Sequence, residues 1–299
     1  MKRESSIFAV KTAGYEKDIG IEMNIKCIAL DLDRTTLNEK GGLSEGNRAA
    51  LRQAMDRGLH IVVASGRSFH TLPQEIRSFA GIEYAVTGNG AATYHMPTEK
   101  CLHKHLLTEE DVRSIMKETE NDIVTYETFI DGVAYAGKEY VDNPELFNAS
   151  PEAIQYMKST RHLKEDIISF IMENKDKLDS IDVIVRNERE KRDIWKRIER
   201  CTSQVYITSS VSQLVEISHK NAGKHMGVAY VANLLGLQRE EVAAFGDAEN
   251  DVDMLRYVGY GIAMENASRE CKAAADYVTK HHNEDGVAYG MRKILKVIE

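Results

Sequence analysis

The stretch "IALDLDRTTLNEKGG", residues 28–42, joins an apolar run to a polar turn and decides the fold. It belongs to the longer run "IKCIALDL", which is nearly all apolar and lacks the alternation of a half-exposed strand. Such a strand is typical of a parallel sheet that is covered on both faces. Asp31 and Asp33 stand where this strand should end. Because ligands bind at the carboxyl ends of strands in parallel sheets, both acids are candidate site residues.

Similar strands and helices alternate on both sides of a middle part that differs. Before residue 90, "HIVVAS" and "EYAVT" predict two more buried strands, and Ser44 can cap a helix that ends near Gly58. After residue 210, strands are predicted at "QLVEIS", "VAAFGD", "YGIAM" and "DYVT", with helices between them. This alternation predicts an α/β fold with a doubly wound parallel sheet.

The middle part, residues 91–210, mixes helices with short strand-like runs such as "DIVTYET" and "IDVIVR". Consecutive strands followed by helices predict an α+β module inserted into the α/β core. We therefore expect a core formed by residues 23–90 and 211–299, and an inserted domain formed by residues 91–210. Residues 1–22 are polar and weakly patterned, so we expect a loosely ordered N-terminal extension.

Composition and charge exclude several classes of protein. The formal net charge of −8 argues against a nucleic-acid partner and against a basic membrane-binding surface. No apolar run approaches the roughly 18 residues that a membrane span needs. The four cysteines are scattered, with neither a disulfide framework nor C-x-x-C spacing, so we expect a cytoplasmic protein. The sequence leaves the oligomeric state open.

Polar residues gather at the predicted strand ends and helix starts. They are Asp31, Asp33 and Thr35 after the first strand, Ser65 and Gly66 after the second, Asn89 in the turn after the third, Lys224 at a helix start, and Asp247, Asn250 and Asp251 after a later strand. If these ends converge, four carboxylates meet near one lysine and need a further cation. Oxygen ligands of this kind indicate Mg²⁺, which often bridges to a phosphate.

These residue types suggest roles in phosphoryl chemistry. Asp31 can attack phosphorus and form an aspartyl-phosphate, while Asp33 can give and take the proton. The other expected roles are phosphoryl binding by Thr35, Ser65 and neighbouring backbone N–H groups, charge neutralisation by Lys224, metal binding by Asp247, and orientation of the site by Asn250 and Asp251.

Five segments together resemble the four motifs of the haloacid dehalogenase-like superfamily. They are "DLDRTTL", "ASGR", "GNGA", "NAGK" and "FGDAENDVDML". The downstream text "GIAMENASRECKAAADYVTKHHNEDGVA" is similar to the Cof-like phosphatases, and the resemblance covers about residues 24–299. It implies a Rossmann-like core with an α+β cap domain of type IIB. It also implies Mg²⁺-dependent hydrolysis of phosphate esters through an aspartyl-phosphate.

The resemblance also assigns roles by position. Asp31 matches the nucleophile, and Asp33 matches the acid/base that also gives the metal a backbone oxygen. The other matches are Ser65 to the phosphate-binding hydroxyl, Lys224 to the motif lysine, Asp247 to the metal-binding acid with Asn250 and Asp251 as its supports, and Asn89 to an asparagine near bound substrate at the core–cap junction. Arg34 and His225 depart from the family pattern, because glycine is common at both positions.

The sequence therefore predicts a phosphatase that acts on a small phosphorylated metabolite, such as a sugar phosphate or a nucleotide-like cofactor. Two other interpretations stay open. A phosphomutase of the same fold would return the phosphoryl group to a sugar. A non-catalytic phosphoacceptor or metabolite-binding protein would use the same acids, hydroxyl and lysine without turnover.

Overall fold

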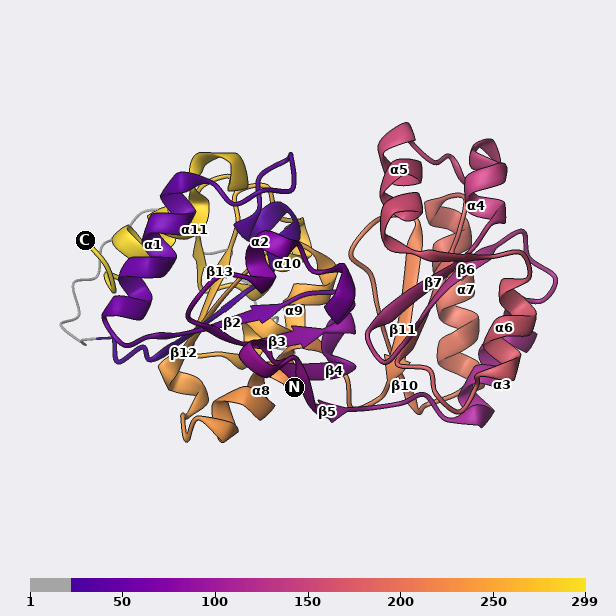
Figure 1. The fold of residues 1–299 in the computed structure, drawn as a ribbon, viewed down its shortest axis with the longest axis horizontal. Coiled ribbons are helices and arrows are strands. Elements are labelled where there is room, and N and C mark those ends of the chain that lie inside the picture. Colours follow the sequence, from indigo (N-terminus) through magenta and orange to yellow (C-terminus); the bar gives the residue numbers. More distant parts are fainter. Residues whose placement is uncertain (1–22) are drawn as a thin grey trace, which may run out of the picture.

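The structure, a computed structural model, describes residues 23–299, and the predicted N-terminal extension lies outside these residues. The described chain forms two bodies, each built on its own sheet, and it passes between them twice (Figure 1). No helix within residues 23–299 is long and apolar enough to cross a bilayer.

The first body contains an eight-stranded sheet with the order β14-β13-β12-β1-β2-β3-β4-β5. The strands are β1 (Cys27–Leu30), β2 (His60–Ala64), β3 (Ile82–Thr87), β4 (Ala92–His95), β5 (Lys100–Lys104), β12 (Val242–Gly246), β13 (Tyr260–Ala263) and β14 (Tyr277–Val278). Strands β14 to β3 pair in parallel, and β4 and β5 extend the sheet antiparallel. The apolar strand β1 lies between β2 and β12, as a strand buried on both faces should.

Helices lie before, between and after the parallel strands along the chain. They are α1 (Glu45–Asp56), α2 (Gln74–Arg77), α8 (Lys224–Leu234), α9 (Val252–Tyr257), α10 (Arg269–Ala274) and α11 (Gly286–Tyr289). The predicted cap of α1 is confirmed, since the Ser44 hydroxyl accepts a hydrogen bond from the Asn47 amide. The crossovers after β1 and after β12 advance in opposite directions along the sheet. Because such crossovers are right-handed, their helices cover opposite faces, which confirms the doubly wound core.

The second body, called the cap below, contains a six-stranded sheet with the order β10-β11-β9-β6-β7-β8. Its strands are β6 (Thr125–Ile130), β7 (Val133–Gly137), β8 (His162–Lys164), β9 (Ser180–Ile184), β10 (Val205–Thr208) and β11 (Leu214–His219), and its helices are α3 (Glu109–Thr119), α4 (Glu139–Asp142), α5 (Pro151–Thr160), α6 (Ile167–Glu173) and α7 (Glu188–Cys201). One face of this sheet packs Tyr126, Ile181 and Ile217 against apolar residues of α3, α6 and α7. The cap is therefore an α+β module, as predicted.

Sheet membership differs from the expected domain boundaries at both junctions. Strands β4 and β5 lie within residues 91–210 but pair in the first sheet, whereas β11 lies after residue 210 but pairs in the cap sheet. The reason is that hydrogen-bonding partners, rather than local patterns, decide which sheet a strand joins. We infer that the chain crosses from core to cap just after Lys104 and returns just after His219.

Two glycines allow the chain to pass closely at this junction. A Cβ atom on Gly90 would lie 2.1 Å from the carbonyl oxygen of Gly223, and Gly90 has a φ of +90°. The amide of Gly223 donates a hydrogen bond of 2.7 Å to the carbonyl of Asn89. This contact places Asn89 directly beside the start of α8, where Lys224 stands.

Candidate active site

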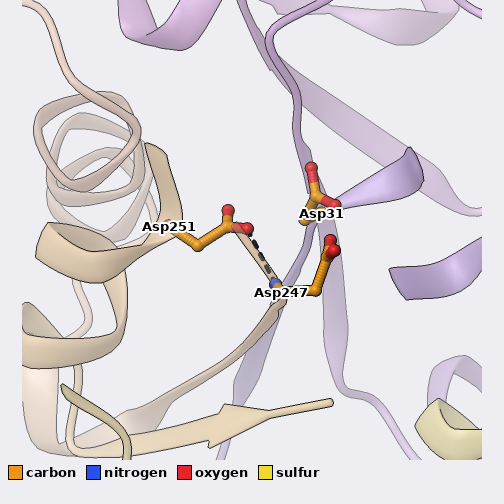
Figure 2. Close-up of side chains that lie close together, drawn as sticks. All are labelled: Asp31, Asp247 and Asp251. Carbon is orange, nitrogen blue, oxygen red and sulfur yellow. Dashed lines mark hydrogen bonds between the residues drawn. The ribbon is translucent and has the colours of Figure 1, made fainter. Parts of the chain in front are cut away.

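The acids after β1 and β12 lie side by side because these two strands are neighbours. Asp31 follows β1 and Asp247 follows β12, and the amide of Asp31 donates a 3.1 Å hydrogen bond to the carbonyl of Phe245. Both side chains are buried. Figure 2 shows their carboxylates together with that of Asp251. Oxygens of these three acids all lie within 4.8 Å of one another.

Lys224 contacts two of these acids. Its Nζ lies 2.7 Å from Oδ1 of Asp31 and 2.7 Å from Oδ1 of Asp251, and all three side chains are buried. The other oxygen of Asp251 accepts hydrogen bonds from the amides of Asp247 (2.9 Å) and Ala248 (3.1 Å). Both oxygens of Asp251 therefore have donors, so this acid orients Lys224 and the loop after β12.

Burial and mutual repulsion shift the pKa values of this cluster. Burial raises the pKa of Asp31 well above its usual range, and the charges of Asp251 and Asp247 add to that rise while Lys224 opposes it. Burial, followed by the charge of Asp251, raises the pKa of Asp247 to about 7. Burial alone would lower the pKa of Lys224, but Asp251 and Asp31 outweigh it and raise that pKa. One lysine does not balance three carboxylates, so the cluster favours an additional cation.

Asp33 lies apart from these three acids. Its side chain is 51% exposed, and its two carboxylate oxygens accept hydrogen bonds of 2.7 Å each from Nε and Nη2 of Arg67. Arg67 is itself fixed by a 3.1 Å bond from Nη1 to the carbonyl of Thr71. The sequence contains Arg67 in "SGR", but nothing in that tripeptide indicates which acid it would bind.

The expected phosphate-binding residues lie around the same strand ends. The hydroxyl of Thr35 donates to Oδ1 of Asp247 at 3.0 Å, so it fixes that acid. The hydroxyl of Ser65 accepts from the amide of Arg67 at 3.1 Å. At Gly66, a Cβ atom would lie 3.1 Å from Oδ1 of Asn89, so the absence of a side chain lets these segments meet.

A chain of amide side chains connects the core to the cap. Nδ2 of Asn250 donates to Oδ1 of Asn89 at 2.9 Å, and Nδ2 of Asn89 donates to Oε1 of Glu216 in the cap at 3.2 Å. Oδ1 of Asn250 is buried and has no hydrogen-bonding partner within residues 23–299. This free acceptor lies in the wall of the cleft between core and cap.

The first departure from the family pattern, Arg34, stands at a position whose backbone favours glycine. Arg34 adopts a left-handed backbone conformation (φ 59°, ψ 13°), which glycine adopts without steric cost. Its side chain is 66% exposed, and Nε lies 3.9 Å from Oδ2 of Asp247. The second departure, His225, is half-buried beside Tyr206, with their ring centroids 6.0 Å apart.

The cleft is a cavity of about 450 Å³. From the core it is lined by Asp31, Asp33, Arg34, Gly66, Arg67, Asp247, Ala248 and Asn250, and from the cap by Glu152, Ala153, Tyr156, Arg161, Ser210, Val211 and Glu216. Sequence reasoning missed every one of these cap residues. One signal was present for Glu216: "LVEIS" places an acid in the middle of a predicted buried strand.

Comparison with known proteins agrees with this geometry. The family model of the haloacid dehalogenase-like hydrolases matches residues 28–291. Phosphatase YwpJ of Bacillus subtilis (strain 168) is 31% identical, over 91% of this chain and 100% of its own. The 5-amino-6-(5-phospho-D-ribitylamino)uracil phosphatase YcsE of the same organism is 29% identical, over 91% of this chain and 96% of its own. The solved structure of a haloacid dehalogenase-like hydrolase from B. subtilis superposes with a TM-score of 0.78 at 30% identity, over 90% of this chain and 100% of that one. The chain therefore belongs to the haloacid dehalogenase-like hydrolases, as a Cof-like phosphatase.

Proposed function

We propose that the protein is a Mg²⁺-dependent phosphatase that hydrolyses small phosphorylated metabolites through an aspartyl-phosphate on Asp31. The observation that carries this proposal is the position of Lys224, whose Nζ contacts both Asp31 and Asp251 at 2.7 Å at the end of the central strand. A buried carboxylate held in one orientation by a lysine is suited to attack phosphorus. The same lysine can neutralise charge on the phosphoryl group.

The donor atoms of the site fit a hard divalent cation. Lys224 and two amides occupy both carboxylate oxygens of Asp251. Within this cluster, Asp31 and Asp247 are therefore the acids with oxygens left for a metal. We propose that these two acids hold Mg²⁺, together with the main-chain oxygen of Asp33. When bound, Mg²⁺ would neutralise negative charge on the carboxylates and on the phosphoryl oxygens.

The proposed reaction consists of two successive displacements at phosphorus. In the first, a carboxylate oxygen of Asp31 bonds to phosphorus, the bond from phosphorus to the leaving oxygen breaks, and Asp33 donates a proton to that oxygen. In the second, a water molecule bonds to phosphorus and gives its proton to Asp33. The bond from phosphorus to Asp31 then breaks and releases inorganic phosphate.

The remaining site residues would hold the phosphoryl group and the acids in place. Ser65 and the backbone of Gly66 are proposed to donate hydrogen bonds to phosphoryl oxygens, and Thr35 orients Asp247 through its 3.0 Å bond. Asn89 and Asn250 would also hold the phosphoryl group, at the side of the cleft that faces the cap. Because these groups are already placed, binding requires little rearrangement.

The cleft suits a small substrate. A volume of about 450 Å³ lies within the usual range for metabolite sites. The substrate named for YcsE is a phosphorylated ribityl chain attached to a uracil ring, and it is one candidate beside sugar phosphates and nucleotide-like cofactors. All four cysteines are free thiols, which fits the proposed action in a reducing cytoplasm.

The test is release of inorganic phosphate from acetyl phosphate and from a panel of phosphorylated metabolites, after treatment with EDTA and again after addition of Mg²⁺. We expect activity only with the metal, and no turnover by Asp31→Asn. Asp56→Asn, at an exposed position on α1, is the matched control and should behave like the unchanged protein.

Borohydride reduction during turnover should convert Asp31 to homoserine, which mass spectrometry detects. Near-normal activity of Asp31→Asn would overturn the mechanism. An isomerised sugar phosphate in place of released phosphate would indicate a phosphomutase.

A further inference from the structure

Three acidic side chains form a row on the cap-sheet face opposite α3, α6 and α7. Glu127 on β6 pairs in register with Asp182 on β9, and Asp182 pairs in register with Glu216 on β11. Their exposed fractions are only 4%, 6% and 4%. Like charges directly opposite each other destabilise antiparallel strands. A feature that destabilises the fold in this way is expected at a site that binds a ligand or catalyses a reaction.

Arg161, at the end of α5, meets one end of this row. Its Nε donates to Glu127 at 2.6 Å and its Nη1 donates to Thr160 at 2.9 Å. These two bonds use two of the five guanidinium N–H groups, which leaves donors for a ligand, and Arg161 lines the cleft. The Cζ atoms of Arg161 and of Arg67 each lie 5.0 Å from the ring centroid of Tyr156. Tyr156 therefore holds a cap arginine and a core arginine in fixed positions.

Glu216, at the other end of the row, also lines the cleft. Its carboxylate accepts hydrogen bonds from Asn89 at 3.2 Å, from the hydroxyl of Ser210 at 3.1 Å and from the amide of Ser210. The cap thus presents a guanidinium donor and a carboxylate acceptor to the space beside the phosphate site. A hydroxyl group both donates and accepts, so a compound with several hydroxyl groups matches this pair.

The charges around the cleft disfavour a second anionic group on the substrate. Each cleft arginine already has a carboxylate neighbour: Arg67 has Asp33, Arg161 has Glu127 and Arg34 has Asp247. A second phosphate or carboxylate would have to displace one of these partners. The acidic row lies next to the cleft, which Glu216 itself lines. Burial, together with the charges of Glu216 and Glu127, raises the pKa of Asp182 well above its usual range.

We propose that Arg161 and Glu216 bind hydroxyl groups of the leaving group, and that the substrate is a phosphomonoester of an uncharged polyhydroxylated compound. This inference rests on the proposed function for the position of the phosphoryl group. It makes Arg161 and Glu216 specificity-determining residues and Tyr156 a positioning residue. Glu127 also acts indirectly, because it binds Arg161 and not the substrate.

Binding is measured by calorimetry on Asp31→Asn in the presence of Mg²⁺, so that no turnover is required. Two matched pairs differ in one anionic group: sorbitol 6-phosphate against 6-phosphogluconate, and fructose 6-phosphate against fructose 1,6-bisphosphate. We expect the member whose phosphate is its only anionic group to bind at least tenfold more tightly in each pair. Inorganic phosphate serves as the reference ligand, because it has no leaving group for the cap to contact.

The cap residues are then changed in the same Asp31→Asn background. Arg161→Gln and Glu216→Gln should each raise the ratio of the sorbitol 6-phosphate Kd to the phosphate Kd at least tenfold. The control Arg192→Gln, on the exposed side of α7, should leave both constants unchanged. Because Arg161→Gln leaves Glu127 buried without its partner, the double variant Glu127→Gln/Arg161→Gln is measured beside it, with circular dichroism to verify the fold.

Equal or tighter binding of the members with two anionic groups would overturn the inference. So would a Kd ratio in the folded double variant that equals the ratio with Arg161 in place. The proposed function fails by a different result, namely no release of phosphate from acetyl phosphate by the unchanged protein with Mg²⁺. The two failures are therefore distinguishable.

Discussion

Arg67 binds both carboxylate oxygens of Asp33, with two hydrogen bonds of 2.7 Å each. This bidentate contact fixes the position of Asp33, the proposed acid/base. The Asp33 carboxylate points toward Arg67 and lies outside the group formed by Asp31, Asp247 and Asp251. Arg67 also contacts Tyr156 of the cap. The position of Asp33 is therefore linked to the position of the cap.

Loss of this contact should slow proton transfer. We expect Arg67→Gln to lower kcat/KM for the alkyl phosphate ester that is turned over best by up to about a hundredfold, because an alkoxide leaving group requires a proton and a misplaced acid delivers it less often. Arg67→Lys should recover only part of the rate, since an ammonium group cannot bind both oxygens in one plane. The pH profile of kcat/KM separates positioning from general damage. A uniform fall at every pH, with an unchanged profile, would contradict the role given to Arg67.

Removal of Lys224 should destabilise the core in a pH-dependent way. Lys224→Met leaves the buried acids without their lysine, so we expect the free energy of unfolding at pH 8 to fall by about 3–5 kcal/mol. The loss should be smaller at pH 5, because Asp247, with its pKa raised to about 7, is protonated there, and the raised pKa of Asp31 also favours the neutral form of that acid. Urea unfolding at both pH values measures the difference. Lys220→Met, at an exposed position nearby, should cost little at either pH, and an equal loss in the two variants would count against this account.

The left-handed backbone of Arg34 should carry a measurable conformational cost. A residue with a Cβ atom loses roughly 1 kcal/mol in this region, whereas glycine does not. Arg34→Gly and Arg34→Ala both remove the guanidinium and differ only in the Cβ atom. We therefore expect Arg34→Gly to be more stable than Arg34→Ala by about 1 kcal/mol in urea unfolding. Equal stabilities would show that the backbone strain is negligible.

Asp179 should make the stability of the protein depend on pH. Burial raises its pKa to about 6, although the amide of Gly132 donates a 3.1 Å hydrogen bond to it. A folded-state pKa above the unfolded value means that the folded state binds the proton more tightly, so this group's contribution is fully present at low pH. It is lost as pH rises from about 4 through 6, and the loss is at most about 3 kcal/mol.

We expect Asp179→Asn to remove that pH dependence, and so to gain stability relative to the unchanged protein between pH 4.5 and pH 8. Asp176→Asn, at an exposed position in the same segment, is the control and should follow the unchanged protein. Unfolding curves in urea across this pH range provide the measurement. Parallel curves for Asp179→Asn and the unchanged protein would contradict the assignment.

The core could be predicted from sequence because its strands carry a local signature. The run that leads into Asp31 is apolar on both faces, and only a strand covered on both sides tolerates this. The convergence of Asp31 and Asp247 followed from one rule, that parallel strands end at the same edge of a sheet. Lys224 is not placed by this rule, because it begins α8 after a strand of the cap sheet. The contacts confirm that these three residues meet, while their roles stay proposals.

The cap could not be predicted to the same depth. The row formed by Glu127, Asp182 and Glu216 exists only because three strands far apart in sequence pair in one register. Register depends on turns and on partner strands, which a single strand sequence does not encode. The contact of Arg161 with Glu127 has the same origin. The proposed specificity residues therefore depend on long-range strand pairing, about which local sequence patterns carry least information.

The position of β1 between β2 and β12 also bears on how the protein is synthesised. Strand β2 leaves the ribosome soon after β1, but β12 follows only after the whole cap has been made. Until then β1 is an edge strand with unpaired backbone groups and an apolar surface, which invites pairing with other chains. The proposed nucleophile Asp31 is thus among the first described residues to be translated and among the last to meet its partners. A nascent chain that stalls before residue 242 would be prone to aggregation and a natural client for chaperones.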